Sequence, residues 1–360
     1  MKKWLLYVCI CLPVLLFSQK ESLQKEIKKI FLYDTEIDFE KTPVSIIGVI
    51  DRDSTFFLNL EDNNNPSNGN KNSIFEIGSI TKVFTATLAA ILAEEDILDW
   101  TEPINSFLPS EYQNPKLEEL TIWDLVNHHG SFPRIPEQFG RHQEKIQDPY
   151  NHYTAENLLQ YYRDYIPKNP NNKFQYSHTG YALLELVLEF AANNSFEDLL
   201  NRHIFSPLKM KNSFIEFPKN KTIFPGLSIS HRKPEPWHFS SFAGSEGMKS
   251  SANDLSIFLK SLMGDHNSFS EIAEKYLQVE APTNYNKQIF IANGWHLIKQ
   301  NKRYNIFTHT GKTSGHNAFI AFIPETKTGV IILSNSVIGT KDLGFLILRM
   351  INDNWNREHE

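Results

Sequence analysis

The stretch Glu76–Thr85, EIGSITKVFT, decides how the rest of this chain is interpreted. After its glycine, apolar residues recur at helical spacing, which predicts an amphipathic and mostly buried helix. These residues are Ile80, Val83, Phe84, Leu88, Ile91 and Leu92. Ser79 then lies in the first turn of the helix, and Lys82 lies one turn later on the same face.

This spacing of serine and lysine suits nucleophilic chemistry. A serine hydroxyl is a poor nucleophile until a neighbouring group accepts its proton. The Lys82 amine could do so if burial or a nearby cation lowers its pKa. The free N–H groups and the positive dipole end of the helix would favour negative charge developing beside Ser79. The same pattern also fits an ordinary helix start with a solvated lysine, so other segments must decide.

Length and composition bound the class of protein. The 360 residues have room for one large domain or two intimate ones. A composition of 41% hydrophobic and 22% charged residues is ordinary for a globular protein. The formal net charge of −6, with no basic stripe, argues against a nucleic-acid partner.

The first residues have the pattern of an export signal. After a short basic start, Trp4–Phe17 is an apolar run that is followed by polar residues. We predict that residues 1–18 are a signal peptide and that the mature protein is periplasmic or secreted, with a membrane anchor as the alternative. Both cysteines, Cys9 and Cys11, lie in this run. Cleavage near Ser18 would leave no cysteine for disulfides, thiol catalysis or metal binding.

The remaining pattern predicts an α/β fold of the α+β type. Val44–Ile50 and Ser54–Leu58 are expected to form a β-hairpin, and Asp342–Trp355 a closing helix. Further strands are expected near the C-terminus, at residues 288–298, 303–308, 317–323 and 329–334. We therefore expect one antiparallel sheet built from both termini and flanked by helices. Residues 19–95 and 286–360 would form this sheet domain, and residues 96–285 a mainly helical inserted domain, with a catalytic cleft between them.

Two other segments carry candidate site residues. Tyr176 lies in KFQYSHTGY (173–181), just before a helical run, where it is either packed or chemically active. Next to cations, the pKa of its phenol could fall far enough for it to act as a base. In FTHTGKTSGH (307–316), Gly311 would let a substrate approach the strand edge. The backbone N–H of Lys312 could join that of Ser79 in holding an oxyanion, although the segment also fits a hairpin turn.

Together the three segments resemble the three motifs of the penicillin-recognising serine hydrolases. They occur in the family's order, as Ser79-x-x-Lys82, then Tyr176-Ser-His178, then His309-Thr-Gly311. The branch they resemble is the class C β-lactamase group with its D-alanyl-D-alanine carboxypeptidase and esterase relatives. Three supporting segments are also similar, and the resemblance runs from about residue 42 to residue 336. These segments are residues 120–133, 204–210 and 243–255.

The resemblance implies a role for each matched residue. Ser79 would be the acylated nucleophile, and Lys82 and Tyr176 would share proton transfer. The backbone N–H groups of Ser79 and Lys312, just after Gly311, would hold the oxyanion.

Two residues depart from the β-lactamase pattern. His178 stands where β-lactamases usually carry an asparagine that would contact the substrate's acyl-amide group. His309 stands where they usually carry lysine, and it would lie beside Thr310, which would help hold a substrate carboxylate. Imidazole is only partly charged near neutral pH, so a fixed cation is less assured, although Lys312 could compensate.

Two other patterns are interpreted as structural. Glu197–Asn201 fits a Glu-x-x-Leu-Asn motif that class A β-lactamases use, but its apolar spacing predicts a packing helix. His128 and His129 lack metal-ligand spacing and are expected to shape a loop beside the cleft.

We therefore expect an exported serine hydrolase that forms an acyl-enzyme with an amide or ester substrate. Candidate substrates are β-lactams, D-alanyl peptides of cell-wall type and small esters. No metal, organic cofactor, nucleic acid or obligate protein partner is expected. The alternative is a module that binds penicillin or cell-wall peptide with little or no turnover. A purely structural envelope protein would instead keep Ser79, Lys82 and Tyr176 apart.

Overall fold

The computed structural model describes residues 21, 23–30, 44–61, 68–142, 148–168, 173–230, 232–264, 267–300, 304–337 and 339–358. The predicted signal peptide lies outside these residues. Residues 21 and 23–30, near the N-terminus, are helical. Within the described part of the chain, no helix combines the length and the apolar character needed to cross a membrane.

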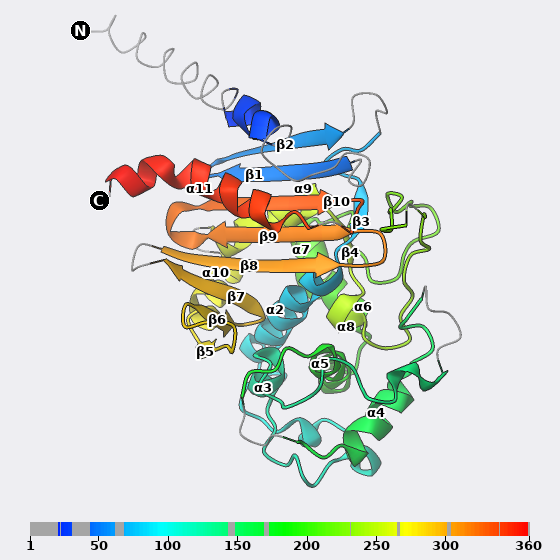
Figure 1. The fold of residues 1–360 in the computed structure, drawn as a ribbon. Coiled ribbons are helices and arrows are strands. Elements are labelled where there is room, and N and C mark those ends of the chain that lie inside the picture. The colour runs from blue at the N-terminus through cyan, green and yellow to red at the C-terminus, as the bar shows by residue number, and fades with distance from the viewer. Residues whose placement is uncertain are drawn as a thin grey trace, which may run out of the picture.

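A large antiparallel sheet of eight strands dominates the upper part of Figure 1, in the order β2-β1-β10-β9-β8-β7-β6-β5. The bounds of these strands are β1 Val44–Asp51, β2 Ser54–Glu61, β5 Glu280–Pro282, β6 Ile289–Ala292, β7 Trp295–Gln300, β8 Tyr304–Lys312, β9 Asn317–Ile323 and β10 Thr328–Ser334. The N-terminal hairpin joins the C-terminal strands through β1 and β10, where Val49 pairs with Val330. The prediction of one sheet built from both termini is confirmed.

The central strands are apolar on both faces because helices cover both. Alternate residues of β1 point to opposite sides, so Ile47 and Val49 pack in one cluster and Ile46 in another. The first cluster includes Ile347 of α11, the helix Lys341–Glu358. On the other face, α9 (Ala252–Leu262) contacts β1 and β10.

One strand prediction was wrong in a way the sequence explains. The continuous strand expected over residues 288–298 is two strands, β6 and β7, that form a hairpin. Asn293 and Gly294 turn the chain with φ values of 44° and 78°. Asn-Gly is the dipeptide that tolerates this left-handed geometry, so the hairpin signal was present. Strand β8 is also longer than expected, since it continues through Lys312.

The helical part of the chain lies below the sheet in Figure 1, where α3, α4 and α5 gather. The remaining helices are α2 Thr81–Glu94, α3 Ile122–Val126, α4 Ala155–Asp164, α5 His178–Ala192, α6 Phe196–Leu200, α7 Ser206–Leu208, α8 Ala243–Glu246 and α10 Ser268–Tyr276. Short 3-10 helices and one π-helix join them: η1 Gly78–Ile80, η2 Ile104–Ser106, η3 Ser110–Tyr112, η4 Phe139–His142, the π-helix η5 Asn201–Phe205 and η6 Pro324–Thr326.

Helix α2 is the link between the two parts. It is buried from Thr81 to Leu92. Its Phe84 ring stacks on Phe258 of α9 with ring centroids 4.1 Å apart. A two-stranded sheet of β3 (Ile74–Glu76) and β4 (Lys249–Ser251) fixes the chain on either side of this helix. The start of α2 is therefore held between the end of β8, α5 and α8.

Candidate active site

Ser79 lies in η1, immediately before α2, and is 7% exposed. Gly78 turns the chain into this position with a φ of +51°. A side chain there would also be too close to β8, since an added Cβ would lie 2.8 Å from the backbone nitrogen of Lys312. The tight turn therefore brings Ser79 next to the last residues of β8.

Gly311, the glycine of the third motif, also lets Ser79 lie close to the end of β8. A Cβ added to Gly311 would lie 1.8 Å from the carbonyl oxygen of Ile77 and 3.1 Å from the backbone nitrogen of Ser79. The missing side chain at Gly311 therefore makes room for the chain before Ser79, and the approach of a substrate to this strand edge stays a prediction. The backbone of β8 and that of Ser79 lie side by side, which suits paired N–H donors.

Lys82 is the second residue of α2 and is fully buried. Its Nζ donates to the Ser79 Oγ at 3.3 Å and to the Ser245 carbonyl oxygen at 2.9 Å. It also donates to Glu246 Oε1 at 3.1 Å. Burial lowers the pKa of Lys82 to about 8, although the Glu246 carboxylate acts to raise it. A substantial share of this amine is thus neutral at mildly alkaline pH and able to accept a proton.

Tyr176 completes a cluster with Ser79 and Lys82. Its phenol interacts with the side chain of Ser79. Its ring centroid is 5.1 Å from Lys82 Nζ and 5.5 Å from the guanidinium carbon of Arg134. Burial, reinforced by Glu246, raises the pKa of Tyr176 above its ordinary value. The expected lowering by cations is corrected, so Tyr176 is a neutral hydroxyl at neutral pH.

The two histidines of the motifs are buried and uncharged. His178 begins α5, and its Nδ1 lies 2.7 Å from Glu246 Oε1. Burial lowers the pKa of His178 to about 4. His309 contacts the Thr310 carbonyl oxygen through Nδ1 at 2.9 Å, and burial holds its pKa well below the ordinary value. Neither ring supplies a fixed positive charge at neutral pH, whereas the side chain of Lys312 is exposed.

Two further histidines surround Tyr176 that sequence reasoning did not place there. The His128 ring centroid is 4.4 Å from that of Tyr176, and the His296 centroid is 6.1 Å away. His128 Nδ1 accepts a hydrogen bond from the Ser177 N–H at 3.1 Å. No cluster of candidate ligands within the described ranges could hold a metal ion. His128 instead orients the segment that carries Tyr176.

Glu246, the last residue of α8, is the other residue that sequence reasoning missed. It is 4% exposed and accepts hydrogen bonds from both Ser79 and Lys82. Close packing places it there: a Cβ added to Gly244 would lie 2.8 Å from the Cβ of Glu185 on α5. Its segment was recognised by resemblance, but nothing in the sequence placed this carboxylate against Ser79.

The acidic residue of the rejected motif has a structural role. Glu197 lies in the short helix α6, and its carboxylate accepts N–H bonds from Ile215 at 3.3 Å and Glu216 at 2.9 Å. It thus fixes a loop.

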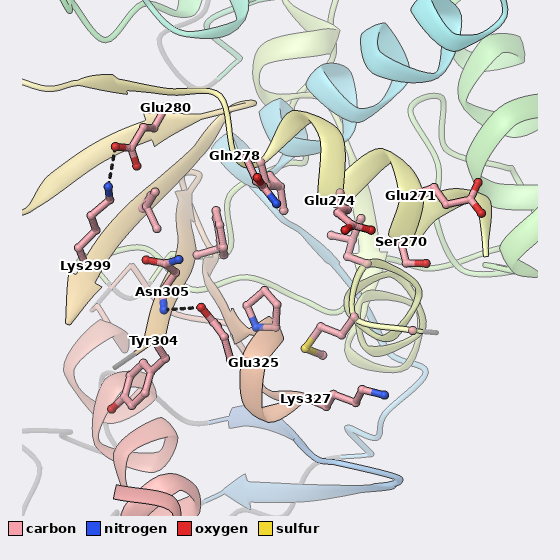
Figure 2. A pocket seen from close by; sticks show the side chains of 18 of the residues that line it. Ser270, Glu271, Glu274, Gln278, Glu280, Lys299, Tyr304, Asn305, Glu325 and Lys327 are labelled. Atoms are coloured by element: carbon pink, nitrogen blue, oxygen red, sulfur yellow. Dashed lines mark hydrogen bonds and ion pairs between the residues drawn. The ribbon is translucent and has the colours of Figure 1, made fainter. Parts of the chain in front are cut away.

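A cavity of about 950 Å³ lies elsewhere, between α10 and the strands β7 and β8 (Figure 2). Three of the charged groups on its wall bond within the protein: Lys299 pairs with Glu280 at 2.6 Å, and Glu325 accepts the Asn305 N–H at 3.1 Å. None of the predicted site residues lines it. The cluster around Ser79 is therefore the better candidate for chemistry.

The chain is similar to known proteins over most of its length. The model of the Beta-lactamase family matches residues 41–350. A curated beta-lactamase from Psychrobacter immobilis is 24% identical over 334 residues, covering 81% of this chain and 79% of that protein. Penicillin-binding protein 4* from Bacillus subtilis (strain 168) is 26% identical, covering 73% of this chain and 61% of that protein.

Solved structures share the fold at low sequence identity. A beta-lactamase/D-alanine carboxypeptidase from Pseudomonas syringae superposes with a TM-score of 0.77 at 19% identity, covering 92% of this chain and 99% of that one. A class C beta lactamase from Rhodobacter sphaeroides gives a TM-score of 0.73 at 21% identity, covering 92% and 97%. These likenesses confirm the predicted fold class.

Proposed function

Because the chain belongs to the Beta-lactamase family and is a serine hydrolase that works through an acyl-enzyme, we propose that Ser79 is its nucleophile. Lys82 is the base for Ser79, and Tyr176 relays protons between Lys82 and the leaving group. One observation carries the proposal: Lys82 and Tyr176, from distant segments, both contact the Ser79 hydroxyl.

The proposed reaction proceeds in two halves. Neutral Lys82 takes the Ser79 proton as Oγ bonds to the substrate's carbonyl carbon. The backbone N–H groups of Ser79 and Lys312 stabilise the oxyanion. The bond to the leaving group then breaks, and the leaving group takes the proton from Lys82 through Tyr176. In the second half, a water molecule attacks the acyl carbon and gives a proton through Tyr176 to Lys82. Lys82 returns this proton to the Ser79 oxygen as the bond between Ser79 and the acyl group breaks.

The substrate is proposed to be an amide or an ester. The relatives are named as β-lactamases, a penicillin-binding protein and a D-alanine carboxypeptidase, which supports β-lactams and D-alanyl peptides. The charge at the site favours small uncharged esters, because His309 is neutral and Lys82 is paired with Glu246. Substrates that carry a carboxylate would depend on the exposed cations Arg134 and Lys312.

Export and the division into parts also remain proposals. The apolar run at residues 4–17 supports a signal peptide over residues 1–18 and a periplasmic or secreted location. We propose that substrate enters between the sheet part, residues 19–95 and 286–360, and the helical insertion, residues 96–285. Within the second range, α9 and β5 pack with the sheet. The contact between β8, η1, α2 and α8 at Ser79 supports this division.

Burst kinetics test the proposed nucleophile. The protein is mixed with a chromogenic ester and, separately, with a chromogenic β-lactam, beside Ser79→Ala. We expect a burst of about one product per protein molecule in the parent and none in the variant. Turnover by Ser79→Ala at the parent rate would end the assignment. A burst without later turnover would identify the acylated binding module instead.

A further inference from the structure

The carboxylate of Glu246 is the meeting point of the proposed catalytic groups. Its Oε1 accepts the Ser79 hydroxyl, accepts Lys82 Nζ at 3.1 Å, and lies 2.7 Å from His178 Nδ1. The proposed chemistry of serine, lysine and tyrosine requires no carboxylate. A buried charge is costly unless it is paired, so its presence beside the nucleophile calls for a functional explanation.

Glu246 and Lys82 fix each other's charge. Burial alone would raise the pKa of Glu246, but the Lys82 ammonium and the His178 ring outweigh it and hold the pKa well below the usual range. The same ion pair limits how far burial lowers the pKa of Lys82, which stays at about 8. At pH 7 the resting site therefore holds an ammonium–carboxylate pair, with the Ser79 hydroxyl donating to the carboxylate.

We propose that Glu246 is a further catalytic residue: it orients the Ser79 hydroxyl, and it holds the proton on Lys82 until the pH is high enough for the amine to accept from serine. This inference rests on the proposed function. Ammonium has no lone pair, so only the fraction with neutral Lys82 starts the reaction. In that fraction the Ser79 hydroxyl turns from Glu246 to the neutral Lys82 amine, and its proton moves to Lys82 as the acyl bond forms. The charge of Glu246 is unchanged throughout.

Other titratable and charged groups lie near the pair of Lys82 and Glu246. The test must separate their effect on the pH profile from that of Glu246. The groups that interact electrostatically with Lys82 or Glu246 are Arg134, Tyr150, Tyr176, His128, His296 and His309. Glu185 is a special case, since burial raises its pKa to about 8 and it accepts the Gly244 N–H at 2.8 Å. It could produce the same pH dependence without touching Ser79, which makes Glu185→Gln the matched control.

The test is the pH profile of kcat/KM for a chromogenic ester. In the parent we expect activity to rise through about pH 8, where Lys82 loses its proton. Glu246→Gln removes the carboxylate charge and keeps the shape of the side chain, which lowers the pKa of Lys82. The rise of kcat/KM in this variant should therefore occur about one pH unit or more lower than in the parent. Glu246→Asp, which restores the charge, should return the rise toward the parent position. Glu185→Gln should leave it in place.

An NMR titration of the Lys82 side chain in Ser79→Ala gives a readout that does not depend on activity. Adding Glu246→Gln to this variant should lower the titration midpoint by the same shift. An unchanged midpoint, or a profile that moves with Glu185→Gln alone, would overturn the role of Glu246. If Ser79→Ala itself hydrolyses the ester at the parent rate, the proposed function fails instead, so the two failures are distinguishable.

Discussion

Two buried carboxylates flank the turn at Ser79, and they are used differently. Glu76, at the end of β3, accepts the Trp237 N–H at 2.7 Å and the Thr313 hydroxyl at 2.9 Å, and it lies 3.2 Å from His316 Nδ1. Glu246 instead accepts from the proposed nucleophile and base. The first cluster ties β3 to the loop after β8, whereas the second surrounds the candidate reaction centre.

The clusters around Glu76 and Glu246 differ in how many buried polar atoms they leave without a hydrogen-bond partner. Near Glu246, several buried polar atoms have no hydrogen-bond partner among the described residues, and they include His178 Nε2, His309 Nε2 and Ser245 Oγ. Both oxygens of Glu76 are engaged. Buried polar groups normally find partners, so the gaps mark the cluster built to meet a substrate. Mutations in the two clusters should therefore have different effects. Those around Glu246 should reduce catalysis, and those around Glu76 should reduce the stability of the fold.

The largest effect is expected for Lys82→Met. This substitution removes the proposed base and keeps a long apolar side chain in the buried space. Loss of a general base costs about 10²–10⁴-fold, and we expect kcat/KM to fall by about 10³-fold. Stopped-flow measurement of the acylation rate checks the expectation. A fall of less than about tenfold would show that another group takes the Ser79 proton.

A smaller loss is expected for Tyr176→Phe. The ring contacts with His128 and Lys82 remain, and only the hydroxyl beside Ser79 is removed. We expect kcat to fall about 10²-fold with the thermal midpoint nearly unchanged. Steady-state kinetics and calorimetry on one preparation test both parts. A variant that is unstable but fully active per folded molecule would instead assign Tyr176 to packing.

The structural role of the Glu76 cluster is tested by Glu76→Gln. The amide cannot satisfy all three donors, so we expect a loss of about 1–3 kcal/mol in unfolding free energy, with little change in turnover per folded molecule. Partner bonds, foremost that of His316, outweigh burial and hold the pKa of Glu76 below its usual value. Its charged form therefore stabilises the fold at neutral pH, and this contribution is lost as the pH falls through the glutamate range. Urea unfolding at pH 7 and pH 4 should show a flatter pH dependence in Glu76→Gln. An equal pH dependence in parent and variant would remove Glu76 from this role.

The smallest effect concerns substrate charge. A pair of esters that differ only by a carboxylate on the acyl side tests whether His309 is a neutral group. We expect the uncharged ester to be preferred by about tenfold in kcat/KM, equivalent to about 1.4 kcal/mol. His309→Lys should narrow the difference. A parent enzyme that prefers the carboxylate ester would show that Arg134 or Lys312 supplies the missing cation.

Much of this arrangement could be predicted from local sequence. The strands β9 and β10 and the N-terminal hairpin follow from apolar runs bounded by turn residues. Motif spacing singled out Ser79, Lys82 and Tyr176, and the structure brings them together, although their catalytic roles stay predictions. The hairpin at Asn293 was missed because a long apolar run outweighed its turn signal.

The surroundings of the site could not be predicted, because they depend on tertiary packing. Glu246 reaches Ser79 across 167 residues, through the close approach of α8 to α5 at Gly244. The directions in which the pKa values of Lys82 and Tyr176 shift depend on burial, and a sequence motif does not show how deeply its residues are buried. The expected lowering for Tyr176 was therefore wrong, whereas that for Lys82 agrees in direction.

Mass spectrometry of the acid-quenched reaction tests whether Ser79 is the residue that the substrate acylates. The parent and Tyr176→Phe, which should slow release of the acyl group, are quenched during turnover of a β-lactam or an activated ester and then mapped by proteolysis. We expect a mass gain equal to the acyl group on the peptide that contains Ser79, with no gain in Ser79→Ala. Hydrolysis with the acyl group on another residue, or an equal gain in Ser79→Ala, would contradict it.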